Sequence, residues 1–157
     1  MHYFEDVTEE AAVGPVRQHL KDCGVINTSY PQEVRWRRAE IEAADLPRLF
    51  MCKCSEFYGL SRNTLRILES TQHYQDGLGE NEHVAGFNEI LGRANPFAGN
   101  LLMVTDSEIG PWTFMDGNHR AILLHARSEL FDCQRLHGTN VFVGIHPNMR
   151  QYNRLVF

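Results

Sequence analysis

The stretch that decides the fold covers residues 101–126 and has the sequence LLMVTDSEIGPWTFMDGNHRAILLHA. Residues 101–104 and 112–115 are apolar runs of strand length, separated by turn-forming residues, which predicts a β-hairpin. Residues 118–130 then carry apolar side chains at helical spacing, which predicts a helix packed against a core. The chain is therefore expected to pass from a strand directly into a helix at Gly117.

The rest of the chain supplies further elements on both sides of this stretch. Asp45 is a candidate N-cap, because helical spacing follows it at Leu46, Leu49, Phe50 and Phe57. Helices are expected at 15–23, from Asp45 to Gly59, after Ser61, and from Asn81 to Asn95-Pro96. Strands are expected at 33–41 and 141–145. A loop is expected at 71–79. The pattern predicts one α+β domain over residues 1–157, a small mixed sheet with flanking helices, and a helical insertion around 45–94.

Composition excludes several classes of protein. The chain has 157 residues, of which 43% are hydrophobic and 22% charged, which suits one folded domain rather than a disordered chain. No apolar run approaches the roughly 20 residues that span a bilayer, and the N-terminus lacks the features of a signal peptide. Four cysteines are few for a disulfide scaffold, and Cys52-Lys53-Cys54 lacks zinc-knuckle spacing. We therefore expect a cytoplasmic protein without membrane contact, whose thiols are reduced and pack as small apolar side chains.

The charge distribution argues against a general nucleic-acid binder. The formal net charge is −5, whereas affinity for nucleic acids depends largely on clustered basic residues that neutralise phosphates. From Pro111 onward the chain has five arginines and three carboxylates, so the C-terminal third is mildly basic. Any phosphate binding is expected to be local and to lie in this third.

The densest chemical signal is the turn from Asp116 to Arg120. The first N–H groups of a helix lack intrahelical acceptors, and the helix dipole favours an anion there, so the amides near Asn118 are expected to hold phosphate. Gly117 permits a positive φ, and Arg120 can bind a phosphate through two hydrogen bonds. His119 can donate to the phosphate or shuttle a proton, and Asp116 can act as a base or orient a neighbour. Asp-Gly-Asn is also ordinary turn and capping chemistry, and this alternative stays open.

The sequence Asp116-Gly117-Asn118-His119-Arg120-Ala121, between an apolar strand and an Ala/Leu helix, resembles the central motif of the ParB/sulfiredoxin superfamily. The resemblance is most specific over residues 101–126, and it extends weakly to residues 38–47 and 141–145. In that superfamily a turn of the form D-G-x-x-R or G-x-x-R holds nucleotide phosphates. The resemblance therefore implies a ParB/sulfiredoxin-like fold and a phosphate-binding turn.

The chemistry of the superfamily transfers only residue by residue. Asn118 occupies the position of the sulfiredoxin catalytic cysteine, so reduction of sulfinic acids is not expected. The second arginine of the CTP-binding box of ParB proteins is missing, and the chain leaves no room for their helix-turn-helix domain. The motif is most similar to that of free-serine kinases, which also use a remote catalytic glutamate. Glu40 and Glu42 are the candidates for that carboxylate.

These observations predict a small enzyme that binds ATP, ADP or CTP, or another phosphorylated metabolite, at Gly117, Asn118, His119 and Arg120. Phosphoryl transfer or hydrolysis on a small-molecule substrate is expected, with Mg²⁺ shared between phosphates and protein carboxylates. The catalytic candidates are Asp116, His119, Glu40 and Glu42. Neither the substrate nor the oligomeric state follows from the sequence.

Two other classes of function stay open. A non-catalytic module could sense a nucleotide or bind DNA, as ParB-like domains do, although the acidic charge disfavours DNA. A metal-dependent hydrolase could use His119 with His83 or His146, although no metal-binding motif such as His-Glu-x-x-His is present.

Overall fold

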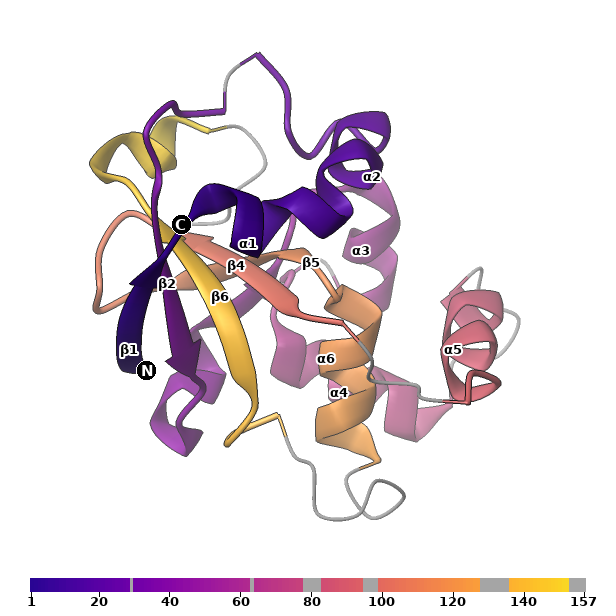
Figure 1. The fold of residues 1–157 in the computed structure, drawn as a ribbon. Coiled ribbons are helices and arrows are strands. Elements are labelled where there is room, and N and C mark those ends of the chain that lie inside the picture. Colours follow the sequence, from indigo (N-terminus) through magenta and orange to yellow (C-terminus); the bar gives the residue numbers. More distant parts are fainter. Residues whose placement is uncertain (29, 63, 78–82, 95–98, 128–135, 153–157) are drawn as a thin grey trace.

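A parallel pair of apolar strands, β4 (Leu101–Thr105) and β6 (Asn140–Ile145), forms the centre of the sheet (Figure 1). All five residues of β4 are buried, as expected for a strand whose two faces are both covered. The computed structural model describes the chain except residues 29, 63, 78–82, 95–98, 128–135 and 153–157. In the described part, the chain forms a single compact α+β domain.

Six strands make up a mixed sheet in the order β1-β2-β6-β4-β5-β3. The β4–β5 pair is the predicted antiparallel hairpin, β2 pairs antiparallel with β1 and β6, and β3 joins the far edge parallel to β5. The bounds of the remaining strands are β1 His2–Val7, β2 Arg35–Glu40, β3 Leu49–Met51 and β5 Trp112–Asp116.

Helices cover both faces of this sheet (Figure 1). On one face lie α1 (Glu9–Val13), the 3₁₀ helix η1 (Gly14–Val16), α2 (Arg17–Asp22) and η4 (Pro147–Gln151). On the other lie α3 (Ser55–Leu60), α4 (Ile67–Asp76), α5 (His83–Leu91) and α6 (Asn118–Ala126). A further 3₁₀ helix, η2 (Ala43–Arg48), leads into β3. Among the described residues, no helix is both long enough and apolar enough to cross a membrane.

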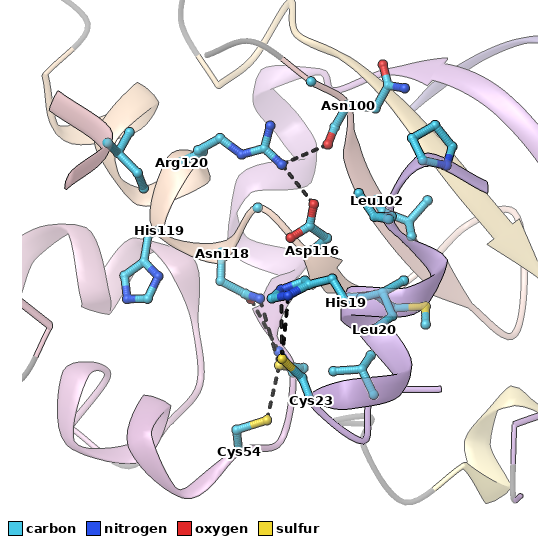
Figure 2. A pocket seen from close by; sticks show the side chains of 18 of the residues that line it. His19, Leu20, Cys23, Cys54, Asn100, Leu102, Asp116, Asn118, His119 and Arg120 are labelled. Atoms are coloured by element: carbon cyan, nitrogen blue, oxygen red, sulfur yellow. Dashed lines mark hydrogen bonds and ion pairs between the residues drawn. The ribbon is translucent and has the colours of Figure 1, made fainter. Parts of the chain in front are cut away.

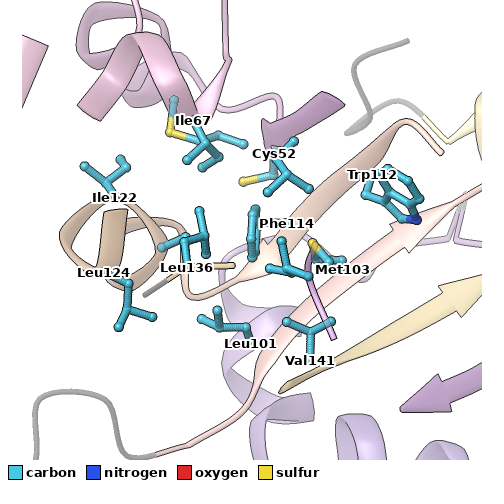
Figure 3. Packing of buried hydrophobic residues seen from close by; sticks show 14 of the residues in the cluster. Cys52, Ile67, Leu101, Met103, Trp112, Phe114, Ile122, Leu124, Leu136 and Val141 are labelled. Atoms are coloured by element: carbon cyan, nitrogen blue, oxygen red, sulfur yellow. The ribbon is translucent and has the colours of Figure 1, made fainter. Parts of the chain in front are cut away.

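Two hydrophobic cores follow from the alternation of side chains along the strands. Leu101 and Met103 face the helices α3–α6, whereas Leu102 and Val104 face α1 and α2. The larger core, on the α3–α6 face, is drawn in Figure 3, where Phe114 of β5 lies among side chains from strands and helices. The sheet is therefore buried on both faces at its centre.

The elements around the hairpin agree in part with the sequence predictions. The strands predicted at 33–41 and 141–145 are β2 and β6, the helix at 15–23 is η1 followed by α2, and α6 is the helix predicted from Asn118. The described part of the helix predicted from Asn81 is α5, but Asn81, Asn95 and Pro96 lie outside the described residues, as do residues 128–130.

The helix predicted from Asp45 to Gly59 is confirmed at its C-terminal end, where α3 lies, but it is wrong over the residues that form η2 and β3. Glu42 is the N-cap of η2, and the Asp45 carboxylate accepts a hydrogen bond from the Glu42 backbone N–H at 2.8 Å, so Asp45 is the third residue of a capping box. Leu49–Met51 then forms β3, because its backbone pairs with β5. The segment 45–94, expected to be a helical insertion, thus contains the helices α3, α4 and α5 and also supplies the edge strand of the sheet.

The segment after Ser61 also differs from the prediction. The Ser61 hydroxyl donates to the Phe57 carbonyl and accepts from the Leu65 N–H at 2.8 Å, so Ser61 closes the turn after α3 instead of capping a helix. The helix α4 begins at Ile67 and continues to Asp76, so the predicted loop at 71–79 is helical over its first six residues. The strand β1 and the helix α1 were not predicted.

Gly144 provides a test of packing across the central strands. A Cβ atom at Gly144 would lie 2.8 Å from Val34 Cγ1 and 2.9 Å from the ring of Trp36, which is 2% exposed. We expect Gly144→Ala to lower the free energy of unfolding by about 1–3 kcal/mol, measured by denaturant titration, because the buried indole must shift.

Gly59 provides the matched control for this substitution. It lies in α3 and is exposed, and a Cβ added there would meet no atom of the described residues within 4 Å. Gly59→Ala should therefore raise the free energy of unfolding by about 0.4–1 kcal/mol. Equal effects of the two substitutions would contradict the packing described for Trp36.

Candidate functional site

The turn between β5 and α6 is built on Gly117. This residue has φ +81° and ψ 18°, the left-handed conformation that glycine adopts without strain, and α6 begins at Asn118 immediately after it. A Cβ at position 117 would lie 2.3 Å from Leu101 Cδ2 and 3.2 Å from Arg120 Nη2. Both the conformation and the close packing therefore require glycine, as the sequence predicts.

Asp116 and Arg120 form an ion pair across this turn (Figure 2). Arg120 Nη2 lies 2.9 Å from Asp116 Oδ2 and also donates to the carbonyl of Asn100 at 2.9 Å. The side chains of Arg120 and Asp116 are 11% and 20% exposed, respectively, so the pair is largely shielded from solvent. A Cβ at Gly99 would approach Arg120 Nη1 to 3.0 Å, which leaves little space around the guanidinium. Arg120 is thus held in one place at the start of α6.

Asn118 joins α6 to the segment that follows β3. Its side-chain oxygen accepts a hydrogen bond from the Cys52 N–H at 3.4 Å, and its Nδ2 donates toward the Cys52 sulfur at 3.8 Å. Asn118 is 6% exposed. Its side chain therefore positions the chain around Cys52, while its backbone belongs to the first turn of α6.

His119 lies in an aromatic environment. The centroid of its ring is 5.5 Å from that of Phe57 and 5.0 Å from that of Phe87. In Figure 2 the ring points away from the Asp116–Arg120 pair. His119 therefore lines the site at a different place from the ion pair, instead of flanking a common anion with Arg120.

A cavity of about 570 Å³ opens onto the turn. Its walls come from both helical layers, because α1 and α2 contribute one side and α3, α5 and α6 the other. Asp116 is the sole carboxylate among the described lining residues and is paired with Arg120, whereas the other lining arginine, Arg93, is paired with Glu89 at 2.6 Å. The apolar part of the wall comprises Ala12, Pro15, Val16, Leu20, Val25, Phe57, Ile90, Leu102 and Met115. The cavity thus suits a ligand with an anionic group and an apolar portion.

The two remote glutamates are not among the described residues that line this cavity. Glu40 ends β2 and is paired with Asn140 of β6, and the Glu42 side chain caps η2 and is 54% exposed. The structure therefore brings Asp116, Gly117, Asn118, His119 and Arg120 together but leaves Glu40 and Glu42 elsewhere.

The histidines offer little support for a metal site. No group of three or more His, Cys, Asp or Glu side chains suited to a metal occurs among the described residues. His146 follows β6, where its backbone N–H bonds to Thr105, so it lies at the opposite end of β4 from the turn. The side chain of His83 falls outside the described part.

Five lining residues outside the turn were not among the predicted site residues. His19 and Cys23 come from α2 and its end, Arg93 follows α5, and Cys52 and Cys54 follow β3. No local pattern marks His19 or Arg93, because tertiary packing alone brings them to the turn. Cys52 is a reduced thiol packed in the larger core, as predicted, whereas Cys54 is only half-buried and Cys23 is exposed.

Comparison of the chain with family models, with curated proteins and with solved structures gave no match. The resemblance to the ParB/sulfiredoxin superfamily therefore stays a prediction from the turn sequence.

Gly117→Ala should strongly destabilise the turn. The substitution combines backbone strain with the contact against Leu101, so we expect a loss of about 2–4 kcal/mol in the free energy of unfolding, measured by denaturant titration. Gly138 is the matched control, because it has φ +84° and an added Cβ would meet no described atom within 4 Å. Gly138→Ala should cost about 1–2 kcal/mol. Equal losses would show that Leu101 does not pack against the turn.

His125, further along α6, should make stability depend on pH. Burial, with a smaller effect of His137, lowers the pKa of His125 below its ordinary value of 6.5. The folded state then binds fewer protons than the unfolded state, so stability contributed by neutral His125 is lost as the pH falls below that value. Unfolding titrations at about pH 7.5 and 5.5 should show a smaller loss on acidification for His125→Gln than for the unmodified protein. An identical loss in both proteins would contradict this role for His125.

Proposed function

We propose that the chain is a small enzyme that binds a nucleotide or another phosphorylated metabolite in the cavity at the Asp116–Arg120 turn. The proposed reaction is phosphoryl transfer to, or hydrolysis of, a small-molecule substrate. The observation that carries the proposal is the position of the turn: the 570 Å³ cavity opens where α6 begins and where Arg120 lies.

The anionic part of the ligand would bind at the first turn of α6. The N–H groups there and the helix dipole favour a phosphate, and Arg120 adds a guanidinium in a largely shielded position. Arg93, on the cavity wall and paired with Glu89, would add a second guanidinium. The apolar wall formed by α1 and α2 would accept the base of ATP, ADP or CTP, or the carbon skeleton of a metabolite.

The ion pair between Asp116 and Arg120 bears on the form of that ligand. A phosphate bound at Arg120 would lie close to the Asp116 carboxylate, and the two negative charges would repel each other. Mg²⁺ relieves such repulsion because it is bound by one or two carboxylates together with substrate phosphates. Asp116 is the lining residue suited to hold it, and the metal would neutralise charge on the phosphates. Asp116 could instead orient a substrate hydroxyl or accept its proton.

His119 has a narrower role in this proposal than its place in the motif implies. Its ring packs against Phe57 and Phe87, so it would contact the substrate side of the cavity and could exchange a proton there. Glu40 and Glu42 are not assigned a role, since neither is among the described lining residues.

A nucleotide sensor is the second candidate function, because the same cavity could bind a nucleotide without catalysing a reaction. Residues 35–38 of β2 have the sequence RWRR, which mixes basic and aromatic side chains, but they give little support to DNA binding. Arg35 and Arg37 are paired with Asp6 and Glu108, Arg38 is paired with Glu5, and the Trp36 indole is 2% exposed and unavailable to stack on a base.

Arg120→Ala should weaken phosphate binding by about 1.5–3 kcal/mol, the range of a hydrogen bond to a charged group. Isothermal calorimetry with ATP, ADP and CTP, each with and without Mg²⁺, measures this change. Arg66→Ala is the matched control, because Arg66 lies over the Phe50 ring and outside the set of described lining residues. Two results would overturn the proposal. One is that Arg120→Ala binds every phosphate ligand as tightly as the unmodified protein does. The other is that the unmodified protein binds none of these ligands.

Turnover separates the enzyme from the sensor. Phosphorus NMR of the protein with a bound nucleotide, Mg²⁺ and a set of hydroxy metabolites should show a new phosphate resonance, and Asp116→Asn should abolish it. Tight binding without turnover would favour the sensor.

A further inference from the structure

Two thiols face each other in the cavity wall. The sulfur atoms of Cys52 and Cys54 are 3.4 Å apart, and both residues line the 570 Å³ cavity. The backbone explains this closeness: Cys54 N–H donates to the Cys52 carbonyl at 2.9 Å, which folds the three residues into a tight turn with both side chains on one side. A disulfide requires a sulfur–sulfur distance of about 2.05 Å, so a small movement would join them.

The surroundings of the pair give the two thiols different properties. Cys52 is 3% exposed and is held by two interactions with Asn118, one to its N–H and one to its sulfur. The second places an amide donor against the sulfur, and such a donor stabilises negative charge there. Cys54 is half-buried, so a small molecule in the cavity reaches it more easily. Figure 2 shows the Cys54 side chain on the cavity side, below Asn118.

We propose that Cys52 and Cys54 form a redox-active dithiol that exchanges with low-molecular-weight disulfides entering the cavity. The Cys54 thiolate attacks one sulfur of a disulfide RSSR, forms a mixed disulfide and releases RS⁻, which takes up the proton that Cys54 lost. The Cys52 thiolate then attacks Cys54 Sγ, forms the Cys52–Cys54 disulfide and releases the second RS⁻, which takes up the proton of Cys52. Two electrons pass from the cysteine sulfurs to RSSR, which becomes two RSH.

This order of attack follows from accessibility and position. The more accessible thiol meets the reagent first, and the buried thiol, 3.4 Å away, resolves the mixed disulfide within the protein. Cys23 also lines the cavity and is exposed, with its sulfur 3.8 Å from the ring nitrogens of His19, so it shows how a thiol in the same cavity but outside the pair reacts with the reagent. The proposal does not depend on which anion binds at Arg120.

Oxidised glutathione tests the exchange. The reduced full-length protein is incubated with it, quenched in acid, alkylated and measured by intact-mass and peptide-mapping mass spectrometry. We expect a peptide that links Cys52 to Cys54 and no alkylation of these two thiols. Cys23→Ser should give the same linked peptide, because Cys23 takes no part.

Two further variants separate the roles of the thiols. Cys52→Ser should accumulate the mixed disulfide of Cys54 with glutathione, because the resolving thiol is missing. Cys54→Ser should form no linked peptide, and its Cys52 should form a glutathione adduct more slowly than Cys54 does in Cys52→Ser. Circular dichroism establishes that each variant is folded, and the unmodified protein provides the decisive measurement in any case. A linked peptide that involves Cys23, its loss in Cys23→Ser, or only mixed disulfides in the unmodified protein would overturn the proposal.

Discussion

The direct passage from β5 into α6 at Gly117 is the constraint on which the site depends. A strand ends and a helix begins within one residue, and this requires the left-handed backbone of Gly117 against the side chain of Leu101. The side chains of Asp116, Asn118, His119 and Arg120 therefore leave the turn in different directions. Asp116 and Arg120 close on each other, Asn118 reaches Cys52, and His119 packs between aromatic rings. The cavity lies beside these side chains, and α1, α2, α3 and α5 complete its wall.

The sequence predicted the elements whose signals are local. The strands β4, β5 and β6 contain runs of apolar residues, and α6 carries apolar residues at helical spacing, so short stretches of sequence are enough to recognise them. The edge strands were missed because their signals are not local: β1 is largely polar and is held by pairing with β2, including the ion pairs of Asp6 and Glu5 with arginines. The three residues of β3 have helical spacing with their neighbours, and a parallel partner more than sixty residues away in sequence makes them a strand.

The candidate site was predictable on one side and not on the other. The residues of the turn are recognisable because the Asp-Gly-Asn-His-Arg sequence lies between a strand and a helix. The rest of the wall comes from α1, α2, α3, α5 and the segments after β3 and α5, and only the folding of the chain brings these parts together. The same limitation explains Glu40 and Glu42. The resemblance to free-serine kinases implies a remote glutamate, but whether a given glutamate lies near the turn depends on strand order, which the sequence does not state.

The cavity lies between helices that are attached to opposite faces of the sheet, and this has a mechanical consequence. The helices α1 and α2 belong to the smaller core, α3, α5 and α6 to the larger one, and the sheet separates these cores elsewhere. A molecule that fills the cavity touches both layers at once and ties them together past the end of the hairpin. Binding would then stabilise the helices on both faces of the sheet. The exchange of amide hydrogens would slow in α2 and in α3 together.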